Sequence, residues 1–556
     1  MAVTGYWNEF IWPRLPPELA DRIVNHMEPN EVATSFRCVS KATAARFSSP
    51  EHTTVRLSRP VPPHAFAARW LAPGATRELT LEQRRQLQRL VAASGVVANL
   101  EVVERATGCL LMNGVFKAAA AAGRLASCQW LWEQGYDIER CDLRALGVAA
   151  GRGHRHVCEW LLSLDIAWFS SGEAEAARSG LVGLMEWLRE QRPTLHWHVL
   201  RSAEPPHAGV AEGVACGCGL ATLQRLLPGL EPLCSHYMER VLSAAARSST
   251  RDWTAKVEWL VAQGCPRSSA ATEAVAGRPD AAERLAWLRD RGFPVGWGAV
   301  EAAAERGNLE VLRRLLAEVT VPSHGRNMVA SGAAGGGRLA VLQLLHGAGW
   351  LLDAPCTAQA AAKAAAKAGQ LHVLAWLVET RSVQLLAWLV ETLGAEAVQL
   401  DSSMFRCAVQ AGSVQLLAWL VETRGAEAVQ LDSSVFTCAA QAGSVQMMAW
   451  LRERGCAWSE SAYSAAAEGG CEAALEWLAE RGCPMPADGD PYCKACVNGD
   501  LAVARCLRRL GVPWGPDGRV YRYASEWDAP EPMLRWLLEA GCPVDSDVHD
   551  ELSSEE

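Results

Sequence analysis

The sequence lacks the excess of basic residues that is typical of nucleic-acid-binding proteins. Its 556 residues include 53 Lys and Arg against 62 Asp and Glu, which gives a formal net charge of -9. Binding to a phosphate backbone depends on Lys and Arg side chains that neutralise the phosphates. We therefore expect a protein that binds no nucleic acid.

Long apolar runs and a secretory leader are also lacking. The Ala-rich stretch 358–368 is interrupted by Lys363 and Lys367, so it does not form the run of about 18 apolar residues that a transmembrane helix needs. No charged-then-apolar leader precedes Trp7, and the 19 cysteines are odd in number for a disulfide framework. We interpret the thiols as small buried hydrophobes in a reducing compartment. These absences predict a soluble protein of the cytoplasm or the nucleus, without a transmembrane segment.

Recognisable catalytic motifs are absent as well. We find no Gly-rich phosphate loop, no Gly-x-Ser-x-Gly and no His-Glu-x-x-His. Cys493 and Cys496 form a lone C-x-x-C in a small-residue helical segment, where packing is a better interpretation than zinc or redox chemistry. We expect a non-enzymatic protein with no catalytic residues, no cofactor and no metal. A remote alternative is a lipid phosphodiesterase related to sphingomyelinases but without a recognisable motif.

Internal repetition is what the sequence has instead. Residues 384–414 and 415–445 differ at only four of 31 positions. A Trp-Leu pair recurs through most of the chain, and apart from one twelve-residue step and one wide gap the spacing is 27 to 33 residues when weaker copies are included. Such a period is typical of a solenoid of stacked helical units. The pairs begin at Trp130, Trp160, Trp187, Trp259, Trp287, Trp376, Trp388, Trp419, Trp450, Trp477 and Trp536.

Each unit predicts two helices. A small-residue run such as 118–123 favours a helix that packs closely on its neighbours, and a Gly turn follows it. An amphipathic segment such as 309–316 then predicts a second helix that ends at Gly or Gly-Cys-Pro. The twelve-residue step from Trp376 to Trp388 would rotate one pair by about 120° from the other, so we expect a local fault between residues 371 and 392.

These units resemble ankyrin repeats. The pattern Ala-Ala-x-x-Gly-His/Asn-Leu-x-Val-x-x-x-Leu-Leu is clearest at residues 149–162 and 303–316. The resemblance covers residues 80–544 in about fourteen degenerate copies, and it implies an all-α, ankyrin-like helical-repeat solenoid that binds protein partners. It also implies that His154 and His156 bond to backbone. The Thr-Pro-Leu-His opening of ankyrin units is missing, so we expect trimmed loops in place of β-hairpin fingers.

Residues 12–50 do not follow the repeat. Leu19, Ile23 and Met27 recur every four residues and predict a helix that starts at Pro16-Pro17 and ends at Pro29. Asn30 is a plausible N-cap for a second short helix, and a third is expected to end near residue 47. We therefore predict a small three-helix unit at the N-terminal end of the array.

This unit resembles the F-box. The residues that match are Leu15, Pro16, Glu18, Leu19, Ile23, Val39, Ser40 and Lys41, although Thr43 stands where the family has an aromatic residue. The resemblance implies docking onto a Skp-type adaptor of a cullin ubiquitin ligase, with an apolar contact formed by Leu15, Pro16, Leu19 and Ile23. The alternative is a helical cap that covers the first repeat of a scaffold with no ligase link.

The tryptophans fall into two classes by position. We assign those of the Trp-Leu pairs to the core. A second set lies past the closing Gly or Pro of a unit, where loops are usually exposed and equivalent loops stack along one edge. These are candidate client-binding residues, with packing of each on its own repeat as the alternative: Trp168, Trp297, Trp350, Trp458 and Trp514.

The expected organisation is an N-terminal tail (1–11), the F-box-like segment (12–50), a linker (51–79), the repeat array (80–544) and an acidic, disordered tail (545–556). Ser553 and Ser554 of that tail precede two Glu and could be kinase sites. The sequence as a whole predicts a substrate receptor of a Skp/cullin/F-box ubiquitin ligase that is monomeric outside the ligase complex.

Overall fold

The computed structural model describes residues 16–544 with the exception of 112–113, 137–143, 165–171, 192–205, 231–233, 351–354, 371, 374–375, 378–431 and 517. Every regular element in this part is a helix, and its one isolated β-bridge joins Cys109 to Asp500. The all-α, helical-repeat prediction is therefore confirmed. Trp388, Trp419 and the acidic tail lie outside the described residues.

Helix pairs make up the array. The first helices of the pairs are α7 (Leu81–Ser94), α9 (Val115–Ala121), α12 (Ala145–Gly151), α14 (Glu173–Arg178), α16 (Pro206–Gly217), α18 (Ser235–Ala246), α20 (Ser269–Ala276), α22 (Gly298–Arg306), α24 (Ser323–Gly335), α26 (Pro355–Lys367), α31 (Ser433–Gln441), α33 (Ser461–Gly469), α35 (Asp490–Val497) and α37 (Arg519–Glu526). The second helices are α8 (Val97–Thr107), α10 (Leu125–Glu133), α13 (Arg155–Leu162), α15 (Val182–Glu190), α17 (Leu220–Leu226), α19 (Trp253–Ala262), α21 (Ala281–Asp290), α23 (Leu309–Glu318), α25 (Leu339–Gly347), α32 (Val445–Glu453), α34 (Glu472–Glu480), α36 (Leu501–Arg509) and α38 (Glu531–Glu539).

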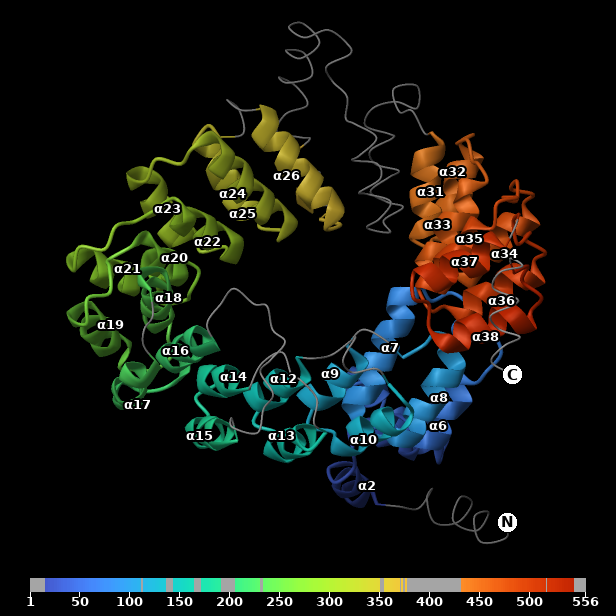
Figure 1. Ribbon diagram of the computed structural model, residues 1–556, viewed down its shortest axis with the longest axis horizontal. Helices are drawn as coiled ribbons and strands as arrows, with labels where there is room; N and C mark the ends of the chain where they lie inside the picture. Colours follow the sequence, from blue (N-terminus) through green and yellow to red (C-terminus); the bar gives the residue numbers. More distant parts are fainter. Residues whose placement is uncertain are drawn as a thin grey trace, which may run out of the picture.

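The pairs stack in two layers. Within the described stretches from α7 to α26 and from α31 to α37, consecutive first helices pack on one another, and second helices pack on second helices, for example α21 on α23 and α32 on α34. Figure 1 shows the described pairs following one another around most of a ring, with the first helices toward its centre. The two ends of the array meet in this ring, because α7 and α8 lie beside the helices from α33 onward.

Small residues allow the first helices to approach closely. Ala303 and Ala304 of α22 are fully buried between neighbouring units. A Cβ atom added to Gly469 would lie 1.9 Å from the carbonyl oxygen of Gln441 on the preceding first helix, so a larger residue does not fit. The Ala- and Gly-rich runs of the sequence therefore set the spacing of the solenoid.

Polar side chains at the turns connect each unit to the one before it. Nε2 of His154 lies 3.1 Å from the carbonyl oxygen of Ala121, and Nε2 of His156 lies 3.1 Å from that of Gly123. The last carbonyls of a helix accept no hydrogen bond from within that helix, so these two histidine contacts pair carbonyl groups that would otherwise be unpaired. The structural role predicted for both histidines is confirmed. Equivalent bonds to the preceding unit are made by Arg124, Asn308, Arg338 and Gln370.

The N-terminal unit has a core of its own. It contains α2 (Pro17–Val24), α3 (Pro29–Thr34), the 3-10 turn η3 (Phe36–Cys38), α4 (Lys41–Arg46) and α5 (Pro50–Thr53). Ala20, Val24, Val32, Phe36 and Phe47 are buried together and separately from the core of the array. A three-helix unit was predicted, and the start at residue 17 and the end near residue 47 are confirmed.

Two details of this unit differ from the prediction. Pro29 does not end the first helix but begins α3, because its fixed φ suits the first helical position. Asn30 is not an N-cap: its buried amide donates to the carbonyls of Arg56, Arg59 and Pro60. This bonding ties the three helices to the chain that follows.

The range expected to be a linker contains a helix that belongs to the array. This helix is α6 (Pro63–Trp70), and it packs on α8. Phe66 is part of the array core, and the amide of Asn99 donates to the carbonyl of Val61 at 2.9 Å. Residues 61–70 therefore act as an end cover of the first repeat.

Candidate functional sites

The F-box-like residues are only partly available for a partner. Leu15 lies outside the described residues, while Pro16 is exposed at the start of α2. Leu19 is 42% exposed, whereas Ala20 and Val24 of the same helix are buried in the core of the unit. Ile23 is half-buried and packs against the core of the unit. An exposed apolar contact can therefore be formed by Pro16 and Leu19, with Ile23 contributing mainly to the fold.

The proposed exposed edge of loop tryptophans is not present. Trp168 lies outside the described residues, and Trp350 is buried at 7% exposure. Trp297, Trp458 and Trp514 are half-buried and pack against the array core. The expectation that these four described residues are exposed is wrong, because each indole is buried in the array core or packs against it. For example, Trp514 lies 4.1 Å from the ring of Tyr492 and 6.0 Å from that of Trp536.

The tryptophans of the Trp-Leu pairs are also placed differently from the prediction. In each described pair the Leu is the core residue, while the Trp is half-buried. Neighbouring positions on a helix differ by about 100°, so the Leu points between the two layers and the Trp points across the boundary to the adjoining unit. The Trp160 ring lies 6.1 Å from that of Phe116, one unit earlier. The paired tryptophans therefore cover the joints between repeats.

Arginines shield these half-buried rings. The guanidinium of Arg291 lies 3.7 Å from the ring centroid of Trp287, and that of Arg454 lies 3.8 Å from Trp450. Both pairs have the spacing i to i+4, which places two side chains on one helix face. The motif Trp-Leu-x-x-Arg-Gly could have indicated this contact from the sequence.

The two ends of the array meet in a joint of defined contacts. The backbone N–H of Ala473 donates to the carbonyl of Arg77 at 3.1 Å, and that of Ala502 donates to Gly108 at 2.9 Å. In the opposite direction, the N–H of Leu110 donates to Gly499 at 3.1 Å. The N-terminal segment thus lies against the turns before α34 and α36. We call these contacts the ring joint.

A fully buried ion pair lies at the centre of the ring joint. Arg84 of α7 donates to both carboxylate oxygens of Asp500, at 2.9 and 2.5 Å, and the two side chains are 1% and 0% exposed. Arg84 also donates to the carbonyl of Gly470 at 2.6 Å and to that of Thr107 at 2.7 Å. Burial opposes the charge on Arg84, but the charge and hydrogen bonds of Asp500 outweigh it and raise the pKa of the guanidinium. The guanidinium of Arg84 therefore remains charged within the interior.

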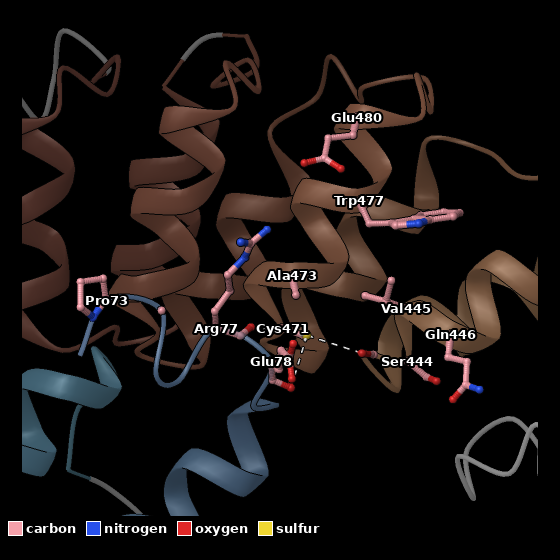
Figure 2. Close-up of a pocket in the computed structure, with 12 residues that line it drawn as sticks. Pro73, Arg77, Glu78, Ser444, Val445, Gln446, Cys471, Ala473, Trp477 and Glu480 are labelled. Atoms are coloured by element: carbon pink, nitrogen blue, oxygen red, sulfur yellow. Dashed lines mark hydrogen bonds between the residues drawn. The ribbon is translucent and has the colours of Figure 1, made fainter. Parts of the chain in front are cut away.

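A cavity of about 710 Å³ opens beside the ring joint. Figure 2 shows its walls, which are residues 73–78 on one side and the first turn of α32 with the length of α34 on the other. Its side chains include Arg77, Glu78, Trp477 and Glu480, and Arg77 forms an ion pair with Glu476. These groups are of mixed charge and do not form a nucleophile with a base, so the cavity has no evident catalytic arrangement.

Many of the described cysteine thiols are buried. Desolvation raises the pKa of the Cys128 and Cys158 thiols to about 12. Burial likewise raises the pKa of Cys493 to about 11, and Cys493 and Cys496 both lie inside α35. Within the described ranges, no group of three His, Cys, Asp or Glu residues is arranged to hold a metal ion. In the same part of the chain, no helix combines the length and the hydrophobicity that crossing a membrane requires.

Comparison with known proteins gives no family. No family model and no curated protein matches the sequence. Among solved structures, the chain is similar to the pentatricopeptide repeat protein PPR10. Two complexes of PPR10 with an 18-nucleotide psaJ RNA element are 12% identical over 98% of this chain and 94% of theirs, at a TM-score of 0.26. PPR10 from maize is 11% identical over 97% of this chain and 99% of its own, at a TM-score of 0.24.

These PPR10 complexes correct one of our expectations. Net charge was used to exclude nucleic acid as a partner, yet the similar helical-repeat structures hold RNA. A whole-chain charge is a sum, so it does not describe how charge is distributed over one surface. The exclusion is therefore wrong as an inference. The low identity and TM-scores assign no ligand to this chain, and its helical-repeat architecture rests on the helix pairs described above.

Proposed function

We propose that this protein is a non-enzymatic adaptor of the cytoplasm or the nucleus that serves as substrate receptor of a Skp/cullin-type ubiquitin ligase. In this proposal the N-terminal unit binds a Skp-type adaptor and the repeat array binds the client. The proposal is supported by the presence of two separately packed parts in the chain: the small N-terminal unit has one core, and the long array has another.

The observation that carries the proposal is the exposed Leu19. A leucine that is 42% exposed on α2, next to the exposed Pro16, forms an apolar surface on a helix whose opposite face is already buried. Large exposed apolar side chains that lie together are common at protein interfaces. The residue types at these positions match the F-box pattern, which supports a Skp-type adaptor as the partner.

A direct binding experiment tests the proposal. Purified full-length protein is titrated with a purified Skp-type adaptor, and the dissociation constant is compared for the wild type, Leu19→Asp and Arg22→Ala. Arg22 is an exposed polar residue of the same helix and serves as the matched control. We expect Leu19→Asp to weaken binding at least about 30-fold, because it places a charge in an apolar contact that is worth about 2 kcal/mol.

Two other results of this experiment would contradict the proposal. If the wild-type protein does not bind the adaptor at concentrations well above those in a cell, the ligase link is refuted and the scaffold without a ligase becomes the function. If Leu19→Asp and Arg22→Ala bind as tightly as the wild type, the contact is not on this face of α2. Circular dichroism of both variants shows whether the helical content is unchanged.

A further inference from the structure

Two turns of the C-terminal repeats bind the side chain of Arg84. The acid at one of these turns, Asp500, explains why this contact is needed. In the turns of several other units, the residue after Gly is a hydrogen-bond donor such as Arg124, His154 or Asn308, which bonds to the unit before it. At the turn before α36 this position is Asp500. A carboxylate only accepts hydrogen bonds, so it cannot satisfy the carbonyl of Gly470 in the preceding unit.

Arg84 supplies what Asp500 cannot. One of its nitrogens donates both to Gly470 and to Asp500, and another donates to Asp500 and to the carbonyl of Thr107 in its own repeat. Without Arg84 the interior would contain an uncompensated carboxylate and an unpaired carbonyl. Leaving a buried charge without its partner is among the most destabilising changes known in proteins.

The backbone around this pair is shaped for close contact. Gly470 has a φ of +74°, and a Cβ atom there would lie 2.5 Å from Cβ of Leu81. A Cβ atom on Gly108 would lie 2.8 Å from Cβ of Ala502. The neighbouring Arg85 donates to the carbonyl of Asn498 at 2.8 Å. Glycine therefore stands on both sides of the ring joint at the places where a side chain would hold the ends apart.

From these contacts we propose that the array is a closed ring in solution, and that the Arg84–Asp500 pair is the latch that closes it. The interaction surface consists of the turns before α34 and α36, and its partner is the segment 77–110 of the same chain. Closure completes the last repeats and covers their turn edge, so this edge is open to other proteins only when the latch is released.

Amide hydrogen exchange on the full-length protein tests the latch. Ala473 and Ala502 are the second residues of α34 and α36, so their N–H groups have no acceptor within the helix. Their protection must come from Arg77 and Gly108 across the ring joint. In a closed ring they should exchange at least about tenfold more slowly than Ala126 and Ala340, which hold the same position in α10 and α25.

Two single variants and their combination identify the pair. Asp500→Asn retains the cap on Val503 but removes the charge, since Asn is an equally good N-cap. Arg84→Met removes the donors from the other side of the joint. Each should reduce the protection of the amides at Ala473 and Ala502 at least about tenfold, and the double variant should cost less than the sum of the two. Arg105→Met, at an exposed arginine of α8, should leave the protection unchanged.

Several results would overturn the proposal. Exchange at Ala473 and Ala502 that is as fast as at Ala126 and Ala340 in the wild type shows an open array. Unchanged protection in both single variants shows that the pair is not the latch. Light scattering that finds a wild-type dimer, with protection lost on dilution, shows that the joint forms between two copies. Helix amides of α9 to α25 report in every sample whether a variant is folded.

Discussion

Replacing Trp458 by Ala should destabilise the region around α31 and α33 by at least about 3 kcal/mol. The indole is half-buried and lies edge-on to Phe436 at 5.6 Å and to Trp477 at 6.2 Å, and the guanidinium of Arg452 lies 3.9 Å from its centroid. Truncating a fully buried Trp to Ala lowers the free energy of unfolding by about 3 to 5 kcal/mol. We take half of that loss for this half-buried side chain. The two aromatic contacts and the cation contact add about 0.5 to 1 kcal/mol each.

Trp527→Ala is the matched control. This residue is 60% exposed at the end of α37, and its described ring contact is with Tyr523 at 5.8 Å. A surface residue with few contacts should change stability by about 0.5 kcal/mol when truncated. The comparison therefore separates a tryptophan that joins repeats from one that is open to solvent.

Hydrogen exchange of the helix amides in α31 and α33 measures the effect locally. A loss of about 3 kcal/mol corresponds to exchange that is more than about 100 times faster by local opening. A change of these rates by less than about fivefold in Trp458→Ala, or by no more than in Trp527→Ala, would contradict a packing role for this indole. In that case the indole is not a joint between units, and its loop is again a candidate edge for binding a client.

Three further predictions concern packing, thiols and cooperativity. Gly469→Ala should lower the free energy of unfolding by about 2 to 3 kcal/mol, since its Cβ would clash with the backbone of Gln441, whereas Gly183→Ala in α15 has open space and should raise it by about 0.5 to 1 kcal/mol in urea titrations. At pH 8 the exposed Cys234 should be alkylated by iodoacetamide, and Cys128 should not until the protein unfolds, because burial raises its pKa to about 12 and leaves little thiolate. Urea unfolding of the array should be broad or multistep, because its stability is a sum over neighbouring units, and one sharp transition with a slope suited to the whole chain would contradict this.

The helix pairs could be predicted from the sequence because their signals are local. Runs of Ala, a Gly turn and an apolar stripe lie within one unit, and residues such as Ala303 and Leu312 are buried as the pattern indicates. The unit borders followed the same logic, with Gly264 and Gly482 in the left-handed conformation after a second helix. The helices and Gly turns that recur with the sequence repeat could therefore be predicted correctly.

The side-chain environment of the tryptophans could not be predicted in the same way. Whether a ring is exposed depends on the adjoining unit, and the contact of Trp458 with Trp477 joins residues of two different repeats. A loop position predicts exposure only when nothing stacks beside it, and in a solenoid each loop has neighbours. Similarly, Asn30 was read as a local cap but bonds to a segment 26 to 30 residues away.

The ring joint is the feature that is hardest to predict from the sequence, because Arg84 and Asp500 are separated by 416 residues. One signal for it was nevertheless present. Several turns place a hydrogen-bond donor after Gly that bonds to the preceding unit, whereas position 500 is an acid, which can only accept. An exception to a repeat indicates that something other than the adjoining repeat completes that turn, and here the completing residue comes from the other end of the array. In a degenerate solenoid, the position that departs from the pattern is therefore where a contact outside the stack should be sought.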